Sequence, residues 1–244
     1  MIYSDDDSLG YSQAQRIFSA GEELKLDKNY CRAHLPLINS AHPDSLAVDG
    51  DYRSGSYERC RYSLVLPVDP VRLKKSVIFQ HINREIEMAS FARKVAWECM
   101  AKRENLLHAT LSSDLTEDKL DDVITKTRSF LALSQGRKYR LGGIFNGPVN
   151  TGRLYFKVYP QLSQKGNDFH RLQSLLGVKE THFFLAGYYN FTDHLNEQET
   201  QELADIVKRY KSGVLWEEKI DELWLLSTHD DLVLSGKILQ KLRP

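Results

Sequence analysis

Asn105–Ser112, which reads NLLHATLS, decides the fold together with a counterpart, Thr181–Tyr188, which reads THFFLAGY. Both stretches are short and largely apolar, and both are predicted to be β-strands. Each contains a histidine, and each is followed by a pattern of helical period, over residues 116–134 in the first case and 196–210 in the second. The two stretches therefore lead two copies of one strand-then-helix unit.

Each copy ends in a pair of strands. After the first helix the strands are predicted over residues 139–145 and 153–159, and after the second over residues 223–227 and 232–238. The connections within each pair are short and contain turn-forming residues, which favours antiparallel pairing. We therefore predict an α+β protein with a bilobal, duplicated fold, in which two antiparallel sheets with outer helices surround a central groove.

Outside the repeat, the chain is predicted to divide near residue 58. Arg61–Val68, which reads RYSLVLPV, is a predicted strand that precedes the first copy, so the two-lobed domain is assigned to residues 59–244. Residues 1–58 are predicted to be an N-terminal extension, partly helical and loop-rich. They hold ten acidic and five basic side chains, so this segment has a charge of −5 and the remainder +5.

Composition limits the classes of function. The 244 residues contain 33 basic and 33 acidic side chains, and this zero net charge argues against bulk binding to long nucleic acid, which needs a large basic face. No apolar run approaches the ~20 residues of a membrane span, and the first residues lack a signal-peptide pattern. The three cysteines lie far apart and have no CxxC spacing, which indicates reduced thiols in a reducing compartment. A cytoplasmic protein without a membrane partner is predicted.

The chemistry of the first leading strand lies in His108 and Thr110. Side chains alternate across a strand, so these two project from one face while Ala109 and Leu111 enter the core. An imidazole that titrates near neutrality can move a proton, and a hydroxyl can donate to a phosphoryl oxygen. With His182 in the second leading strand, the two copies would present a histidine each to one groove and act on a phosphodiester without a metal.

His108-Ala-Thr110-Leu and His182-Phe-Phe184-Leu resemble the paired His-x-Thr/Ser-hydrophobic motifs of the 2H phosphoesterases, which include the 2′-5′ RNA ligase-like cyclic phosphodiesterases. The resemblance covers roughly residues 57–242. It implies a metal-independent phosphodiesterase that hydrolyses a cyclic phosphate or a 2′-5′-type linkage in a nucleotide or RNA end. The catalytic acid/base pair would be His108 and His182, in either order, with Thr110 binding phosphate and no cofactor.

The second motif departs from the family pattern at Phe184. A phenyl ring cannot donate to a phosphoryl oxygen, and losing a hydrogen bond to a charged group costs ~1.5–3 kcal/mol. Phe184 is instead a candidate for lining the groove and stacking on a base. The alternative is a catalytically impaired 2H-like scaffold that serves as a nucleotide-binding or protein-interaction module, with residues 1–58 as the candidate partner surface. No metal site is predicted, and the other histidines, His34 among them, are assigned no role.

Overall fold

The computed structural model describes residues 2–164 and 166–244, with residue 114 described by its backbone only. Its main strands form one ten-stranded sheet, not the two separate sheets expected from the sequence, and the two halves of this sheet, here called lobes, join at one residue pair. In the first lobe β3 pairs with both β4 and β11, and β11 pairs with β12; in the second lobe the order is β9-β6-β5-β10. The bounds are β3 Ser56–Pro67, β4 His108–Leu115, β11 Leu223–Asp230, β12 Lys237–Leu242, β9 Leu185–Asn190, β6 Arg153–Pro160, β5 Lys138–Phe145 and β10 Val214–Lys219.

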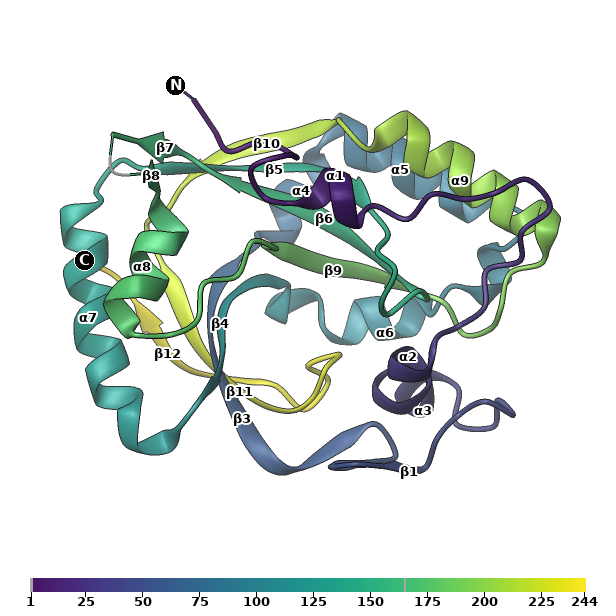
Figure 1. Ribbon diagram of the computed structural model, residues 1–244, viewed down its shortest axis with the longest axis horizontal. Coiled ribbons are helices and arrows are strands. Elements are labelled where there is room, and N and C mark those ends of the chain that lie inside the picture. The colour runs from purple at the N-terminus through teal and green to yellow at the C-terminus, as the bar shows by residue number, and fades with distance from the viewer. Residues whose placement is uncertain (1, 165) are drawn as a thin grey trace.

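The lobes join where Ala109 of β4 pairs with Ala186 of β9. Both alanines are fully buried, so the junction is part of the core and brings the two strands together at the centre of the molecule (Figure 1). The mixture of helices with a sheet whose described strand pairs are antiparallel confirms the α+β prediction.

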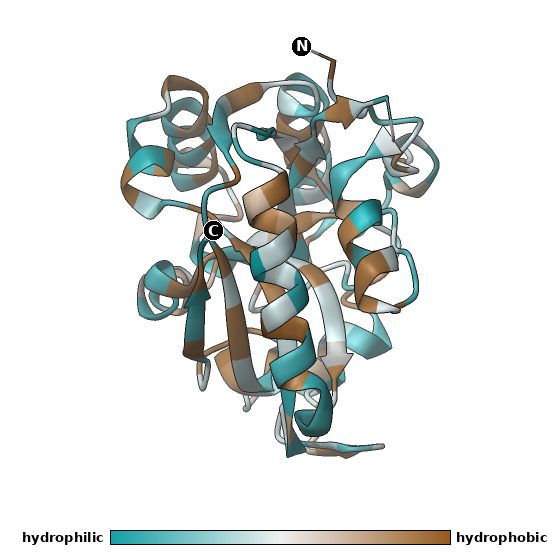
Figure 2. Ribbon diagram, turned by 90° about the vertical axis from the view of Figure 1, so that its left-hand side faces the viewer, coloured by the Kyte–Doolittle hydropathy of each residue, from teal (hydrophilic) through white to brown (hydrophobic). Residues whose placement is uncertain are grey.

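Two pairs of helices cover the lobes. Helices α7 (Leu120–Leu133) and α8 (Asp168–Leu176) lie together on the first lobe, and α5 (Val77–Met88) and α9 (Glu197–Tyr210) lie together on the second (Figure 1). Figure 2, which faces the side of α7 and α8, shows hydrophobic and hydrophilic residues alternating along the helices. This amphipathic pattern buries one stripe of each helix against its sheet.

The helix ends follow local sequence signals. Helix α9 begins at a capping box, in which the Asn196 side chain accepts from the Glu199 amide and the Glu199 carboxylate accepts from the Asn196 amide. Helix α8 ends at Gly177, whose φ of 70° is the left-handed conformation that glycine adopts most readily.

Shorter elements connect these units. The remaining helices are α1 Tyr11–Ala14, α2 Lys28–Ala33, α3 Leu35–Ile38, α4 Pro70–Lys75 and α6 Trp97–Lys102; 3₁₀ turns lie at Ala92–Lys94, Glu104–Leu106 and Glu117–Lys119; the short strands are β1 Val48–Asp49, β2 Tyr52–Arg53, β7 Leu162–Ser163 and β8 Gly166–Asn167. Among the described residues, no helix has the length and apolar character needed to cross a bilayer.

The N-terminal segment is built into the body of the fold. The Tyr11 hydroxyl is buried, donates to the carbonyls of Phe184 and Val158, and accepts from the Phe184 amide. The carboxylate of Asp6 accepts two 2.8 Å hydrogen bonds from Lys157, which is only 1% exposed. The boundary placed after residue 58 falls inside β3, so residues 1–58 and the sheets share one core.

Candidate functional site: a basic hollow between the lobes

A polar hollow of about 230 Å³ lies where β4 and β9 meet. Its lining includes His108 and Thr110 from β4, so the strand presents this pair to a cavity as the sequence predicts. A second hollow of about 220 Å³ adjoins it and shares His108 and Thr110. Pockets for drug-sized ligands occupy ~300–1,000 Å³, so either hollow alone suits a small group, and the two together suit a nucleotide-sized ligand.

His108 is held as a neutral imidazole. Its Nδ1 lies 2.6 Å from the Leu106 carbonyl oxygen, which accepts a hydrogen bond and therefore places the proton on Nδ1. Burial lowers the pKa of His108 to about 4, and the positive charges of Arg103 and Arg153 act in the same direction. Near neutral pH, the second ring nitrogen, Nε2, is then a hydrogen-bond acceptor with a free lone pair.

Arg103 lies at the end of α6 and is only 6% exposed. Its Nη2 donates to the carbonyl oxygens of Gly187 and Tyr188, each at 2.7 Å. Burial lowers the pKa of Arg103 to about 10, and the neighbouring charge of Arg153 contributes to the shift. The group therefore remains a cation at neutral pH.

Arg153, the first residue of β6, lies across β9 beside Arg103. A Cβ on Gly187 would come within 2.2 Å of Arg153 Nε, so the guanidinium occupies space that only glycine leaves open. Arg153 Nη1 donates to His34 Nε2 at 3.0 Å and to the Asp231 carbonyl oxygen at 3.1 Å. Neither Arg153 nor Arg103 forms an ion pair with any carboxylate whose side chain the structure describes.

His34 reaches the hollow from the end of α2, in the N-terminal segment. It is 1% exposed and stacks on Tyr30 with ring centroids 4.9 Å apart. Because an arginine can only donate, His34 Nε2 accepts and its proton is on Nδ1. Burial and then the charge of Arg153 lower its pKa well below the ordinary value, which keeps the ring neutral.

Three buried donors around this hollow lack an acceptor within the described part of the chain: Arg103 Nε, Arg153 Nε and His34 Nδ1. A buried donor without a partner costs ~1–3 kcal/mol, more when it is charged. With the positive charge of Arg103 and Arg153 and the hydroxyl of Thr110 in its lining, this hollow is complementary to an anion whose atoms only accept hydrogen bonds.

Asp231 marks the border between the two hollows and lines both. Its main-chain oxygen faces Arg153, whereas its carboxylate accepts from the hydroxyls of Tyr52 and Tyr57. Burial raises the pKa of Asp231. The carboxylate is thus engaged by the tyrosines and does not form an ion pair with Arg103 or Arg153.

The structure does not bring His182 to this hollow. The predicted strand over residues 181–188 begins only at Leu185, so His182 lies in the irregular segment before β9. Its side chain is exposed, and its ring contacts that of His170 with centroids 5.3 Å apart. His182 is absent from the lining of both hollows that contain His108.

Phe184 lies in the core. It is 0% exposed and contacts Phe169 edge-to-face, with centroids 4.9 Å apart. The groove position suggested by the sequence is therefore not the one it occupies, and a fully buried ring has no face on which a base could stack.

The pairing of Ala109 with Ala186 shows which residues β9 presents to the hollow in place of His182 and Phe184. By the local symmetry of an antiparallel pair, the position of His108 in β4 corresponds to that of Leu185 in β9, and Thr110 corresponds to Gly187. Leu185 and Gly187 both line the hollow, so the second lobe offers an aliphatic side chain and a glycine there. The guanidinium of Arg153 lies against Gly187, where any other residue would place a Cβ. In the sequence, the glycine within a predicted strand was the one feature that indicated a close approach of another group to the backbone here.

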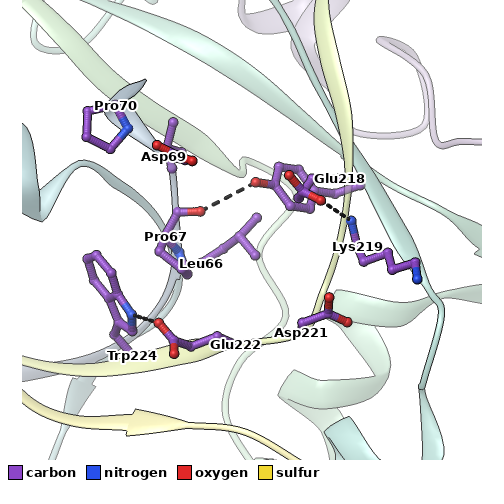
Figure 3. Close-up of a pocket in the computed structure, with 11 residues that line it drawn as sticks. Leu66, Pro67, Asp69, Pro70, Glu218, Lys219, Asp221, Glu222 and Trp224 are labelled. Atoms are coloured by element: carbon purple, nitrogen blue, oxygen red, sulfur yellow. Dashed lines mark hydrogen bonds between the residues drawn. The ribbon is translucent and has the colours of Figure 1, made fainter. Parts of the chain in front are cut away.

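A larger hollow, of about 330 Å³, has the opposite charge (Figure 3). Trp224 forms part of its wall and donates from Nε1 to Glu222 at 2.6 Å. Four carboxylates line it against one lysine, Lys219, so its charge is negative and would repel a phosphate; the carboxylates belong to Asp69, Glu218, Asp221 and Glu222. Among the described side chains, no cluster of three or more histidine, cysteine or carboxylate groups is arranged to hold a metal.

Comparison with known proteins adds little. No family model matches the sequence, and no curated protein matches it significantly. A crystal structure of TT0787 from Thermus thermophilus is similar over 75% of this chain and 97% of that chain, with 15% sequence identity and a TM-score of 0.41. A likeness at this level carries no argument about function.

Proposed function

We propose that this chain binds the phosphate group of a nucleotide or of an RNA end in the hollow beside His108. The observation that carries the proposal is the pair of guanidiniums, Arg103 and Arg153, which line one small hollow and form no ion pair with a described carboxylate. Arg103 is only 6% exposed, and an unpaired buried charge is strongly unfavourable, so such an arrangement calls for a counter-charge from outside the chain. Arginine suits this role because its planar fork matches phosphate oxygens.

Two further features support a phosphate ligand. Thr110 supplies a hydroxyl beside the arginines, as the resemblance of His108-x-Thr110 to the 2H phosphoesterases implies. The adjoining hollow gives the organic part of the ester a place to lie, against Tyr57, Ser63 and Thr228. A His108–His182 acid/base pair is not part of the proposal, because His182 lies outside both hollows.

The binding test uses isothermal titration calorimetry with adenosine monophosphates and inorganic phosphate. We expect Arg153→Gln and Arg103→Gln each to weaken binding about tenfold or more, since each removes hydrogen bonds to a charged group worth ~1.5–3 kcal/mol. Arg72→Gln is the matched control, because Arg72 pairs with Glu218 at the acidic hollow. Absence of phosphate binding by the folded protein would rule the proposal out, as would equal losses in all three variants.

A second candidate is hydrolysis of a cyclic phosphate with His108 as a single general base. The hydrogen bond from Nδ1 to Leu106 favours it, because it leaves neutral Nε2 to accept a proton from water or from a ribose hydroxyl. Incubation with adenosine 2′,3′-cyclic phosphate and a metal chelator tests it. Turnover that His108→Ala abolishes and His182→Ala leaves intact supports a one-histidine enzyme, and no turnover leaves a binding module.

A further inference from the structure

We infer that the phosphate ligand is a monoester carried as a dianion, in preference to a cyclic phosphodiester with its single charge. This inference rests on the proposed function and narrows its substrate class. It comes from counting charges around the hollow of Arg103 and Arg153.

The two arginines are the fixed cations of the hollow. They lie close enough for the charge of Arg153 to act on Arg103, and both are held by neutral acceptors: main-chain carbonyls and the His34 ring. Such partners satisfy hydrogen-bond geometry and leave the charge uncompensated. Two guanidiniums thus remain to be neutralised, and a phosphate dianion does so with one group.

The other titratable side chains that line this hollow are either neutral at neutral pH or not paired with the two arginines. His34 and His108 are neutral, since burial holds both pKa values below the ordinary range. Tyr155 is also neutral, because burial raises its pKa. Asp231 directs its carboxylate to Tyr52 and Tyr57 and offers the arginines only its main-chain oxygen.

The hydrogen-bond donors of the lining favour the same ligand. Arg103, Arg153 and Thr110 all line the hollow and can donate to the oxygens of a phosphate there. A terminal phosphate monoester presents three non-bridging oxygens, all strong acceptors, whereas a phosphodiester presents two. The monoester can therefore satisfy one more donor and place its second charge between the guanidiniums.

The experiment compares adenosine 2′-, 3′- and 5′-monophosphate with adenosine 2′,3′-cyclic phosphate by calorimetry at pH 7.5. We expect the best monoester to bind about tenfold to a hundredfold more tightly than the cyclic ester, as for one additional charge-assisted hydrogen bond. Lowering the pH through ~6 converts the monoester to its monoanion and should remove most of this preference. His108 and His34, with their lowered pKa values, stay largely neutral over that step.

Variants connect the preference to the two charges. Arg103→Gln and Arg153→Gln should each reduce the ratio of monoester to cyclic-ester affinity to about one, whereas Arg103→Lys, which keeps the charge, should retain most of it. Circular dichroism confirms folding of each variant, and Arg72→Gln should leave the ratio unchanged. A cyclic ester that binds the wild-type protein as tightly as every monoester overturns the inference and leaves phosphate binding intact. Binding of neither ester overturns both.

Discussion

Gly187→Ala is the change that probes the site most directly without touching a charged group. A methyl group at this position would lie 2.2 Å from Arg153 Nε and 2.3 Å from Nη2, far inside van der Waals contact. The atoms in conflict belong to a flexible side chain, so we expect the guanidinium to swing out of the hollow while β9 keeps its pairing. Arg153 then loses its hydrogen bonds to His34 and Asp231.

Two consequences can be measured on one variant. The free energy of unfolding should fall by about 1–3 kcal/mol, the usual net value of two such hydrogen bonds, as read from urea denaturation. The affinity for an adenosine monophosphate should fall about tenfold to 150-fold, because one charge-assisted contact worth ~1.5–3 kcal/mol is removed. Calorimetry on the folded variant gives the second number.

The control is a double-mutant cycle with Arg153→Ala. If Gly187→Ala acts only by displacing the guanidinium, it should change phosphate affinity by less than ~0.5 kcal/mol when the guanidinium is already absent. A folded Gly187→Ala protein that binds within twofold of the wild type would refute the reasoning, since the arginine would then be dispensable or able to reach the ligand from elsewhere.

Further predictions test other parts of the structure. His182→Ala should leave phosphate binding unchanged in calorimetry, because the side chain is exposed outside both hollows; a tenfold loss would place it in the site. Phe184→Thr should lower the free energy of unfolding by about 3–5 kcal/mol, as for loss of a fully buried aromatic ring, and a cost below ~1 kcal/mol in urea titration would contradict the core position. Tyr11→Phe should cost about 1–3 kcal/mol, since the hydroxyl holds both main-chain groups of Phe184, and an unchanged urea midpoint would show that these bonds contribute nothing. His108 has a folded-state pKa of about 4, below the ordinary ~6.5, so its stabilising effect is complete above pH 6.5 and is lost as the pH falls toward 4. The free energy of unfolding should fall by about 3 kcal/mol over this pH range, at ~1.4 kcal/mol for each unit of the pKa shift. In His108→Asn the free energy of unfolding should depend less on pH over the same range, and an unaltered dependence would contradict the lowered pKa of His108.

Local pattern predicted the elements well wherever one face of a segment is apolar. The helices expected over residues 116–134 and 196–210 correspond to α7 and α9, since helical periodicity and end signals act within a few residues of one another. The strand expected from residue 181 begins four residues later. The apolar run there includes Phe184, which is buried against α8 before regular pairing of β9 starts.

The sequence by itself determined the α+β class, the antiparallel pair of β5 and β6, and the projection of His108 and Thr110 from one face of a strand, because each depends on residues close together in the chain. The second predicted pair, over residues 223–227 and 232–238, was misplaced, since β11 continues to Asp230 and β12 begins only at Lys237. Only the tertiary structure decided which groups join His108 and Thr110. Arg103, Arg153 and His34 come from three separate segments, and their convergence depends on the pairing of Ala109 with Ala186 and on the open space at Gly187. Spacing in one sequence carries no information about such long-range contacts. His182, which its place in the second strand-then-helix unit had matched to His108, lies outside the hollow for the same reason.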